Sequence, residues 1–115
     1  MKLGDKQRLF TKCISDLINY TYAMGHELTF GDAYRDQRVH GEFGKKGSYS
    51  ASKSVHKLRL AVDLNLFVNG EYITDGDHPV YKEIGELWEG MNENARWGGR
   101  FNDANHFSFE HWGVK

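Results

Sequence analysis

Residues 58–70 read LRLAVDLNLFVNG. Apolar side chains at Leu58 and every second position up to Val68 alternate with other residues, which is the period-two pattern of a β-strand with one buried face. Asn69-Gly70 follows directly, and this dipeptide is the strongest short-range signal for a hairpin turn. The segment therefore predicts a strand that ends in a hairpin.

The chain before this strand predicts a helix, a short strand and a loop. Residues 5–23 carry apolar side chains at three- and four-residue spacing, which indicates an amphipathic helix that Gly25 would end. Residues 27–35 indicate a short strand, although Gly31 weakens it. Residues 36–53 are rich in glycine and serine and predict a long surface loop.

The chain after the hairpin predicts a second helix and two more strands. Pro79 suits the first turn of a helix that Asp77 would cap and that runs to about Asn92. Residues 96–98 and 105–110 are interpreted as short strands. This order predicts an α+β fold with a mainly antiparallel sheet flanked by helices.

Composition limits the classes of function. A chain of 115 residues fits one domain and is too short for two independent cores. Its formal charge of −1 provides no basic field for nonspecific nucleic-acid binding. The lone cysteine, Cys13, is expected in the core. Neither a signal peptide nor an apolar run long enough to span a bilayer is found, so we expect synthesis in the cytoplasm without membrane insertion.

Two histidines and an aspartate are candidate metal ligands. His56 and Asp63 lie at the entrance and in the middle of the predicted strand, and His106 begins another. Two imidazoles and a carboxylate suit a catalytic Zn²⁺, which keeps a fourth position for water. Asp103 lies three residues before His106, where a carboxylate can serve as general base. On the chemistry alone, a turn aspartate beside a hydrogen-bonded histidine explains this pair equally well.

These residues also resemble a family. The stretch Ser54-Val-His56-Lys-Leu-Arg59-Leu-Ala61-Val-Asp63 resembles the S-x-H-x-x-G-x-A-x-D motif of the M15 zinc peptidases, the D-alanyl-D-alanine carboxypeptidase and dipeptidase group. Trp97-Gly98-Gly99 and Asp103-Ala-Asn-His106-Phe107 are similar to its W-G-G and D/E-x-x-H-F patterns. Aspartate in place of glutamate at the start of the second pattern resembles the bacteriophage members, which are L-alanyl-D-glutamate endopeptidases acting as endolysins.

The resemblance covers residues 26–110 and has one clear departure. A segment around Arg35 is similar to the family strand that ends in a substrate-facing arginine. Arg59 replaces the glycine of the first motif, so the backbone between the ligands is expected to run differently, with this side chain pointing outward or toward the substrate. The fold implied is the one shared by hedgehog proteins and D,D-peptidases. Residues 1–115 are then expected to form a single catalytic domain with no separate wall-binding module.

The resemblance also implies a role for each site residue. His56, Asp63 and His106 would bind Zn²⁺, Asp103 would act as the catalytic base, and Arg35 would face the oxyanion or the substrate carbonyl. An ion pair with a neighbouring aspartate is the alternative for Arg35. Two further residues, Ser54 and Trp97, would contact substrate; a simple turn serine and a packed core ring are the respective alternatives.

The predicted function is zinc-dependent cleavage of the peptide stem of bacterial peptidoglycan at the L-alanyl-D-glutamate bond, by a phage endolysin during host lysis. We expect a monomer that accumulates in the host cytoplasm and depends on a separate holin-like protein to reach the cell wall. A D-alanyl-D-alanine carboxypeptidase is the second candidate. An H-N-H-type metal nuclease and a non-catalytic zinc-stabilised binding module are candidates from other classes.

Overall fold

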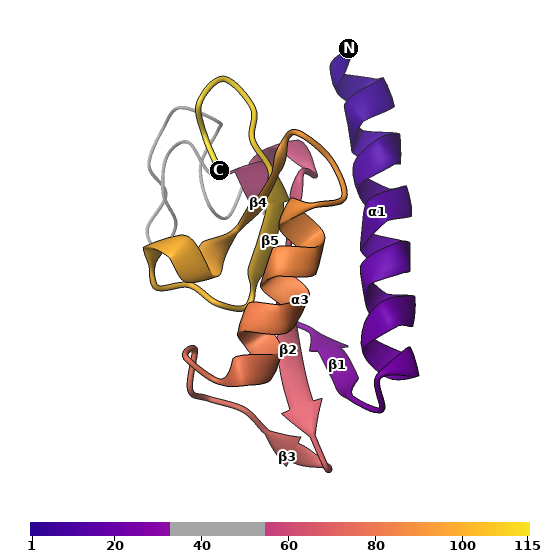
Figure 1. The fold of residues 1–115 in the computed structure, drawn as a ribbon. Helices are drawn as coiled ribbons and strands as arrows, with labels where there is room; N and C mark the ends of the chain where they lie inside the picture. Colours follow the sequence, from indigo (N-terminus) through magenta and orange to yellow (C-terminus); the bar gives the residue numbers. More distant parts are fainter. Residues whose placement is uncertain (33–54) are drawn as a thin grey trace.

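The computed structural model describes residues 1–32 and 55–115, which form an antiparallel sheet and two α-helices (Figure 1). Helices α1 (Leu3–Ala23) and α3 (Pro79–Glu89) pack against each other and against the sheet. Phe10 of α1 makes edge-to-face contacts with Trp88 of α3 and with Phe109, at ring-centroid distances of 5.7 and 5.2 Å. The predicted α+β class is confirmed.

The sheet has the strand order β1-β2-β5-β4, and β3 pairs with the far end of β2. Its strands are β1 (Glu27–Phe30), β2 (Ala61–Val68), β3 (Glu71–Tyr72), β4 (Ala95–Trp97) and β5 (His106–Phe109). Two short 3-10 helices complete the described fold: η1 (Val55–Leu58) precedes β2, and η2 (Gly98–Phe101) follows β4. All described strand pairs are antiparallel, and Asp63 lies directly opposite His106 in the β2–β5 pair.

Alternation along β2 separates an apolar face from a polar one. Val62, Leu64 and Leu66 are almost fully buried and belong to the core beneath the helices, while Asp63 and Asn65 are partly exposed. Cys13 lies in this core, as predicted. The sequence pattern thus leaves one face of the central strand to carry polar side chains.

The main local predictions are confirmed, but β2 begins later than predicted. The helix expected over residues 5–23 is α1, and Asn69 and Gly70 form the hairpin turn with φ of 54° and 77°. The predicted strand start at Leu58 is wrong, because residues 55–58 form η1 and Arg59 has a φ of 56°. A left-handed residue interrupts the extended backbone, so β2 can start only at Ala61.

Other boundaries also differ from the predictions. Strand β1 ends at Phe30 instead of residue 35, although backbone bonds to Asp63 continue through Gly31 and Asp32. The cap of α3 is His78 rather than Asp77, since His78 Nδ1 accepts a hydrogen bond from Val80 N at 3.1 Å.

Helix α3 ends at Glu89, short of the predicted Asn92. The strands predicted over residues 96–98 and 105–110 lie at 95–97 and 106–109. The loop predicted over 36–53 lies wholly in the stretch 33–54, outside the described residues. Within the described part of the chain, no helix combines the length and apolar character needed to cross a membrane.

Candidate metal centre

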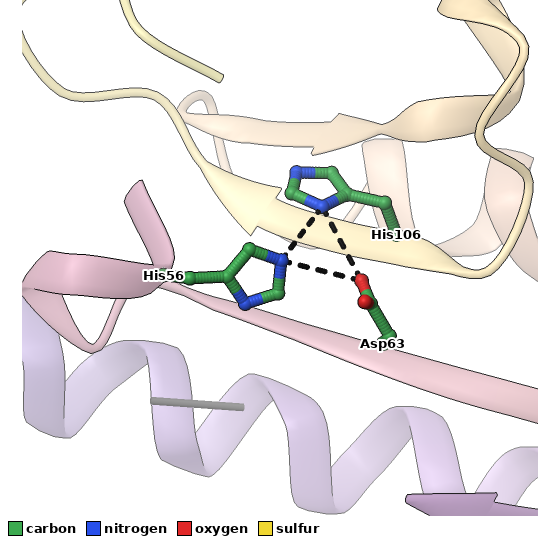
Figure 2. Close-up of side chains that lie close together, drawn as sticks. All are labelled: His56, Asp63 and His106. Atoms are coloured by element: carbon green, nitrogen blue, oxygen red, sulfur yellow. Dashed lines mark hydrogen bonds and ion pairs between the residues drawn. The ribbon is translucent and has the colours of Figure 1, made fainter. Parts of the chain in front are cut away.

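Three side chains from separate elements converge on the polar face of the sheet (Figure 2). His56 comes from η1, Asp63 from β2 and His106 from β5. His56 Nε2 lies 3.3 Å from Asp63 Oδ1 and 3.2 Å from His106 Nδ1, and His106 Nδ1 lies 3.5 Å from Asp63 Oδ1. We call these three atoms the ligand triad.

The ligand triad has the dimensions of a zinc site. Tetrahedral nitrogen and oxygen ligands about 2.0–2.1 Å from Zn²⁺ are separated by about 3.3–3.4 Å, close to the three distances found here. Asp63 Oδ1 is buried and accepts no hydrogen bond from the residues that the structure describes. A buried carboxylate oxygen needs a charged or metallic partner, so the residues present fit a zinc ion.

The electrostatics of Asp63 favour the ionised ligand. Burial by itself would raise the pKa of this carboxyl, but the adjacent imidazoles of His106 and His56 outweigh burial and lower the pKa to about 2. The side chain is therefore a carboxylate at neutral pH, as metal coordination requires.

Close backbone packing sets the position of Asp63. Gly31 donates its N–H to Asp63 O at 2.7 Å, and Asp63 N donates to Asp32 O at 2.6 Å. A Cβ at Gly31 would lie 3.1 Å from the Asp63 Cβ, so the edge strand approaches this ligand closely. On the other side, the β2–β5 register places His106 opposite Asp63. Two neighbouring backbones therefore hold the carboxylate beside the imidazoles.

Asp103 lies next to the ligand triad without belonging to it. Its Oδ2 is 3.9 Å from His106 Nδ1, and its side chain is 51% exposed, in contrast to the nearly buried imidazoles. The turn that carries Asp103 is closed by bonds from Asp103 N to Gly98 O and from His106 N to Asp103 O, and Asn102 has a left-handed φ of 62°. The carboxylate is thus open to solvent and lies beside the ligand triad, which is the placement that a general base needs.

A comparison with protein families agrees with this arrangement. The family model Peptidase_M15_4, described as D-alanyl-D-alanine carboxypeptidase, matches residues 48–109, more than half of the chain. The chain belongs to the M15 peptidase family. The matched span contains the ligand triad and Asp103, so this protein is a metallopeptidase with a candidate zinc site. No curated protein matches the chain significantly.

Trp97 of this M15 peptidase supports the turn that carries the candidate base. The residue is only 5% exposed, and its Nε1 donates to Ala104 O at 2.7 Å. A Cβ at Gly85 of α3 or at Gly99 would lie 2.1 or 2.2 Å from atoms of its ring. These glycines leave the space that the ring occupies. The structure thus gives Trp97 a positioning role, and its predicted contact with substrate remains a prediction.

The sequence interpretation missed two neighbours of His106. Its Nε2 lies 3.2 Å from the backbone oxygen of Lys115, so an Nε2–H donating to this oxygen would leave Nδ1 free of a proton and ready for a metal. Phe101 packs edge-on against the same imidazole at 5.7 Å. A backbone oxygen carries no residue-type signal, which explains why the motif spacing did not reveal it.

Two predicted site residues are not placed by the structure. Arg35 and Ser54 both lie outside the described residues, so their roles stay predictions. Arg59, the departure from the family motif, is exposed and has the left-handed conformation that favours glycine. This exposure agrees with the expectation that its side chain points outward or toward the substrate.

Proposed function

We propose that this M15 metallopeptidase cleaves the L-alanyl-D-glutamate bond in the peptide stem of bacterial peptidoglycan and serves as a phage endolysin in host lysis. Family membership supports a zinc peptidase acting on peptidoglycan-like substrates. The observation that carries the proposal is the carboxylate of Asp103, 3.9 Å from one atom of the ligand triad. The aspartate at this position, where other members have glutamate, supports the endopeptidase assignment.

His56, Asp63 and His106 would hold the metal, and Asp103 would move the proton. Zn²⁺, when bound, supplies a Lewis acid that polarises the scissile carbonyl and acidifies a water molecule. Asp103 would accept the proton of the attacking water and deliver it to the leaving amine, because its half-exposed carboxylate lies 3.9 Å from one atom of the ligand triad. The burial of the two imidazoles excludes solvent from one side of the site.

The remaining roles follow from the sequence. Arg35 is proposed to stabilise the negative charge that develops on the carbonyl oxygen, and Ser54 to contact substrate. We further propose a monomer that is made in the host cytoplasm and reaches the cell wall after a holin-like protein opens the inner membrane.

A D-alanyl-D-alanine carboxypeptidase is the second candidate function. The description of the matching family model favours it. The two activities differ in the bond cut, so the released products distinguish them.

The test is digestion of purified peptidoglycan by the zinc-loaded protein, with mass spectrometry of the fragments. New L-alanine C-termini paired with new D-glutamate amines are expected. Asp103→Asn should lower kcat by about 10²–10⁴-fold while zinc content is unchanged, since only the proton acceptor is lost. Asp16→Asn on the exposed surface of α1 is the matched control and should retain full activity.

Free D-alanine among the products would assign the carboxypeptidase instead. Absence of cleavage by protein that holds one zinc ion would refute both peptidase functions. Full activity of Asp103→Asn would remove this residue from the proton transfer.

A further inference from the structure

A polar pocket of about 260 Å³ adjoins Asp103. Its walls come from the connection between β3 and α3 on one side and from the turn before β5 on the other, and they include Tyr72, Thr74, Tyr81, Asn102, Asp103 and Asn105. Asp103 is thus shared, because its carboxylate lines the pocket and also lies beside the ligand triad. The volume suits a single amino-acid residue rather than a large ligand.

The described lining of this pocket is neutral except for one negative charge, and it combines polar residues with the apolar Ile73 and Ala104. Asn102, Asn105, Thr74 and Tyr72 are its polar neutral residues beside Asp103, whereas the Tyr81 hydroxyl accepts a hydrogen bond from the Leu66 N–H of β2. The described lining residues include neither lysine nor arginine. An anionic group placed here would meet a like charge, and the described lining residues offer no cation to offset its desolvation. A neutral group with hydrogen-bond donors and acceptors would find matching partners.

Asn105 is held in a fixed orientation for such a contact. Its Nδ2 donates to Asn65 Oδ1 at 3.1 Å, and Asn65 belongs to the polar face of β2. This bond uses one N–H group of the Asn105 carboxamide, which has a second N–H and an oxygen with which to bind a ligand. A carboxamide on the ligand can form both a donor and an acceptor bond with it, whereas a carboxylate can only accept.

We propose that this pocket binds the substrate residue on the leaving-amine side of the scissile bond and selects a residue whose group beside that amine is a neutral carboxamide rather than a carboxylate. This inference rests on the proposed function, in which Asp103 protonates the leaving amine. The leaving residue must then lie against Asp103, which is one of the residues that line the pocket. A terminal D-alanine carries a carboxylate beside its amine, so the same lining disfavours carboxypeptidase substrates.

The first test compares two synthetic stem peptides with the zinc-loaded protein. They differ only in the group on the residue after the scissile bond, which is D-glutamate with a free α-carboxylate in one and its α-carboxamide in the other. We expect kcat/KM about tenfold higher for the carboxamide, the effect of gaining a hydrogen bond and losing a like-charge contact. Cleavage of both peptides with equal efficiency, or faster cleavage of the carboxylate, would overturn the inference while leaving the proposed function intact.

Binding separates this inference from the proposed function. If neither peptide is cleaved, the proposed function fails, and the Kd of each peptide is measured by NMR from the side-chain amide signals of Asn102 and Asn105. Tighter binding of the carboxamide, with shifts of these signals, would still support the pocket assignment. Equal binding, or no shift of either signal, would refute it.

A charge introduced into the pocket should reverse the preference. Thr74 is an exposed lining residue, and Thr74→Lys would supply a cation without altering the ligand triad or Asp103. We expect the carboxamide-to-carboxylate ratio of kcat/KM, or of affinity, to fall at least fivefold in this variant. Thr11→Lys on the exposed surface of α1 makes the same change of charge outside this pocket and should leave the ratio unchanged. An unaltered ratio in Thr74→Lys would place the leaving residue elsewhere.

Discussion

The two segments that carry the candidate ligands differ in how their backbones fit the site. Between His56 and Asp63, Arg59 has a φ of 56° at the position where the family motif has glycine. Between Trp97 and His106, Gly98 is so close to its surroundings that a Cβ would lie 2.1 Å from Asp103 O and 2.6 Å from the His106 Cβ. In the first segment glycine would relieve a backbone angle, which is a modest energy. In the second segment the absence of a side chain at Gly98 leaves room for the Asp103 backbone and His106, and any other residue type would fill that room.

The largest predicted effect concerns the second segment. Gly98→Ala should lower the free energy of unfolding by about 3 kcal/mol, because the new methyl group must displace the backbone of Asp103 or the His106 side chain. Zinc affinity and activity should fall with it. Urea denaturation and zinc titration measure the two effects.

Gly90→Ala is the control for this prediction. A Cβ at Gly90 would meet its nearest atoms at 3.6 and 3.8 Å, which is ordinary contact, so stability and zinc affinity should be nearly unchanged. Wild-type zinc binding by Gly98→Ala would show that the second segment is as adaptable as the first.

Zinc should stabilise the fold by linking the two segments, because His56 and Asp63 come from one segment and His106 comes from the other. Free zinc at about 100 times its Kd should raise the free energy of unfolding by about 2.7 kcal/mol, and a chelator should reverse the gain. Scanning calorimetry with and without metal measures this difference. An unchanged Tm at saturating zinc would mean that the ligand triad does not bind the ion.

A smaller loss of stability is expected when the hydrogen bond that supports the second segment is removed. Trp97→Phe removes the N–H that bonds to Ala104 O and should lower the free energy of unfolding by about 1–2 kcal/mol. Trp112→Phe, at a residue that is 79% exposed, is the matched control and should change it by less than about 0.5 kcal/mol. If chemical denaturation gave equal changes in the free energy of unfolding for the two substitutions, the positioning role of Trp97 would be refuted.

The smallest predicted change in the free energy of unfolding concerns the first segment, and it is a gain instead of a loss. Arg59→Gly should raise the free energy of unfolding by up to about 1 kcal/mol, because relief of the left-handed conformation exceeds the added flexibility of the unfolded chain. Arg59→Ala keeps the conformation without the relief and should show no gain. Stabilisation by alanine but not glycine would place the effect in the side chain instead of the backbone angle.

The sequence predicted those parts of the fold that depend on local patterns. The structure contains three features that short stretches of sequence predict: the alternation in β2, the Asn69-Gly70 turn and the apolar stripe of α1. The boundaries were less predictable because tertiary contacts decide them. Strand β2 starts later than predicted because Arg59 is left-handed, and the propensities of arginine do not suggest that conformation.

In the candidate site, too, local patterns were predictable and tertiary contacts were not. Residue types and spacing identified His56, Asp63 and His106, and the cross-strand register then brings Asp63 opposite a residue far along the chain. Spacing could not reveal that the Lys115 backbone oxygen lies against His106, since main-chain atoms are common to all residues. It also could not show that Trp97 is enclosed between glycines of α3 and η2, which only the packed structure brings together.

The contact between Gly85 and the Trp97 ring determines which face of α3 packs toward the turn that carries the candidate base. Each residue inserted into an α-helix rotates the rest of the helix by about 100°. Adding or removing one residue between Pro79 and Gly85 would therefore rotate the glycine away and present a side chain to the ring. An insertion of about a full turn before Gly85 would return the glycine to the ring, whereas any other insertion there would move the turn that carries the candidate base.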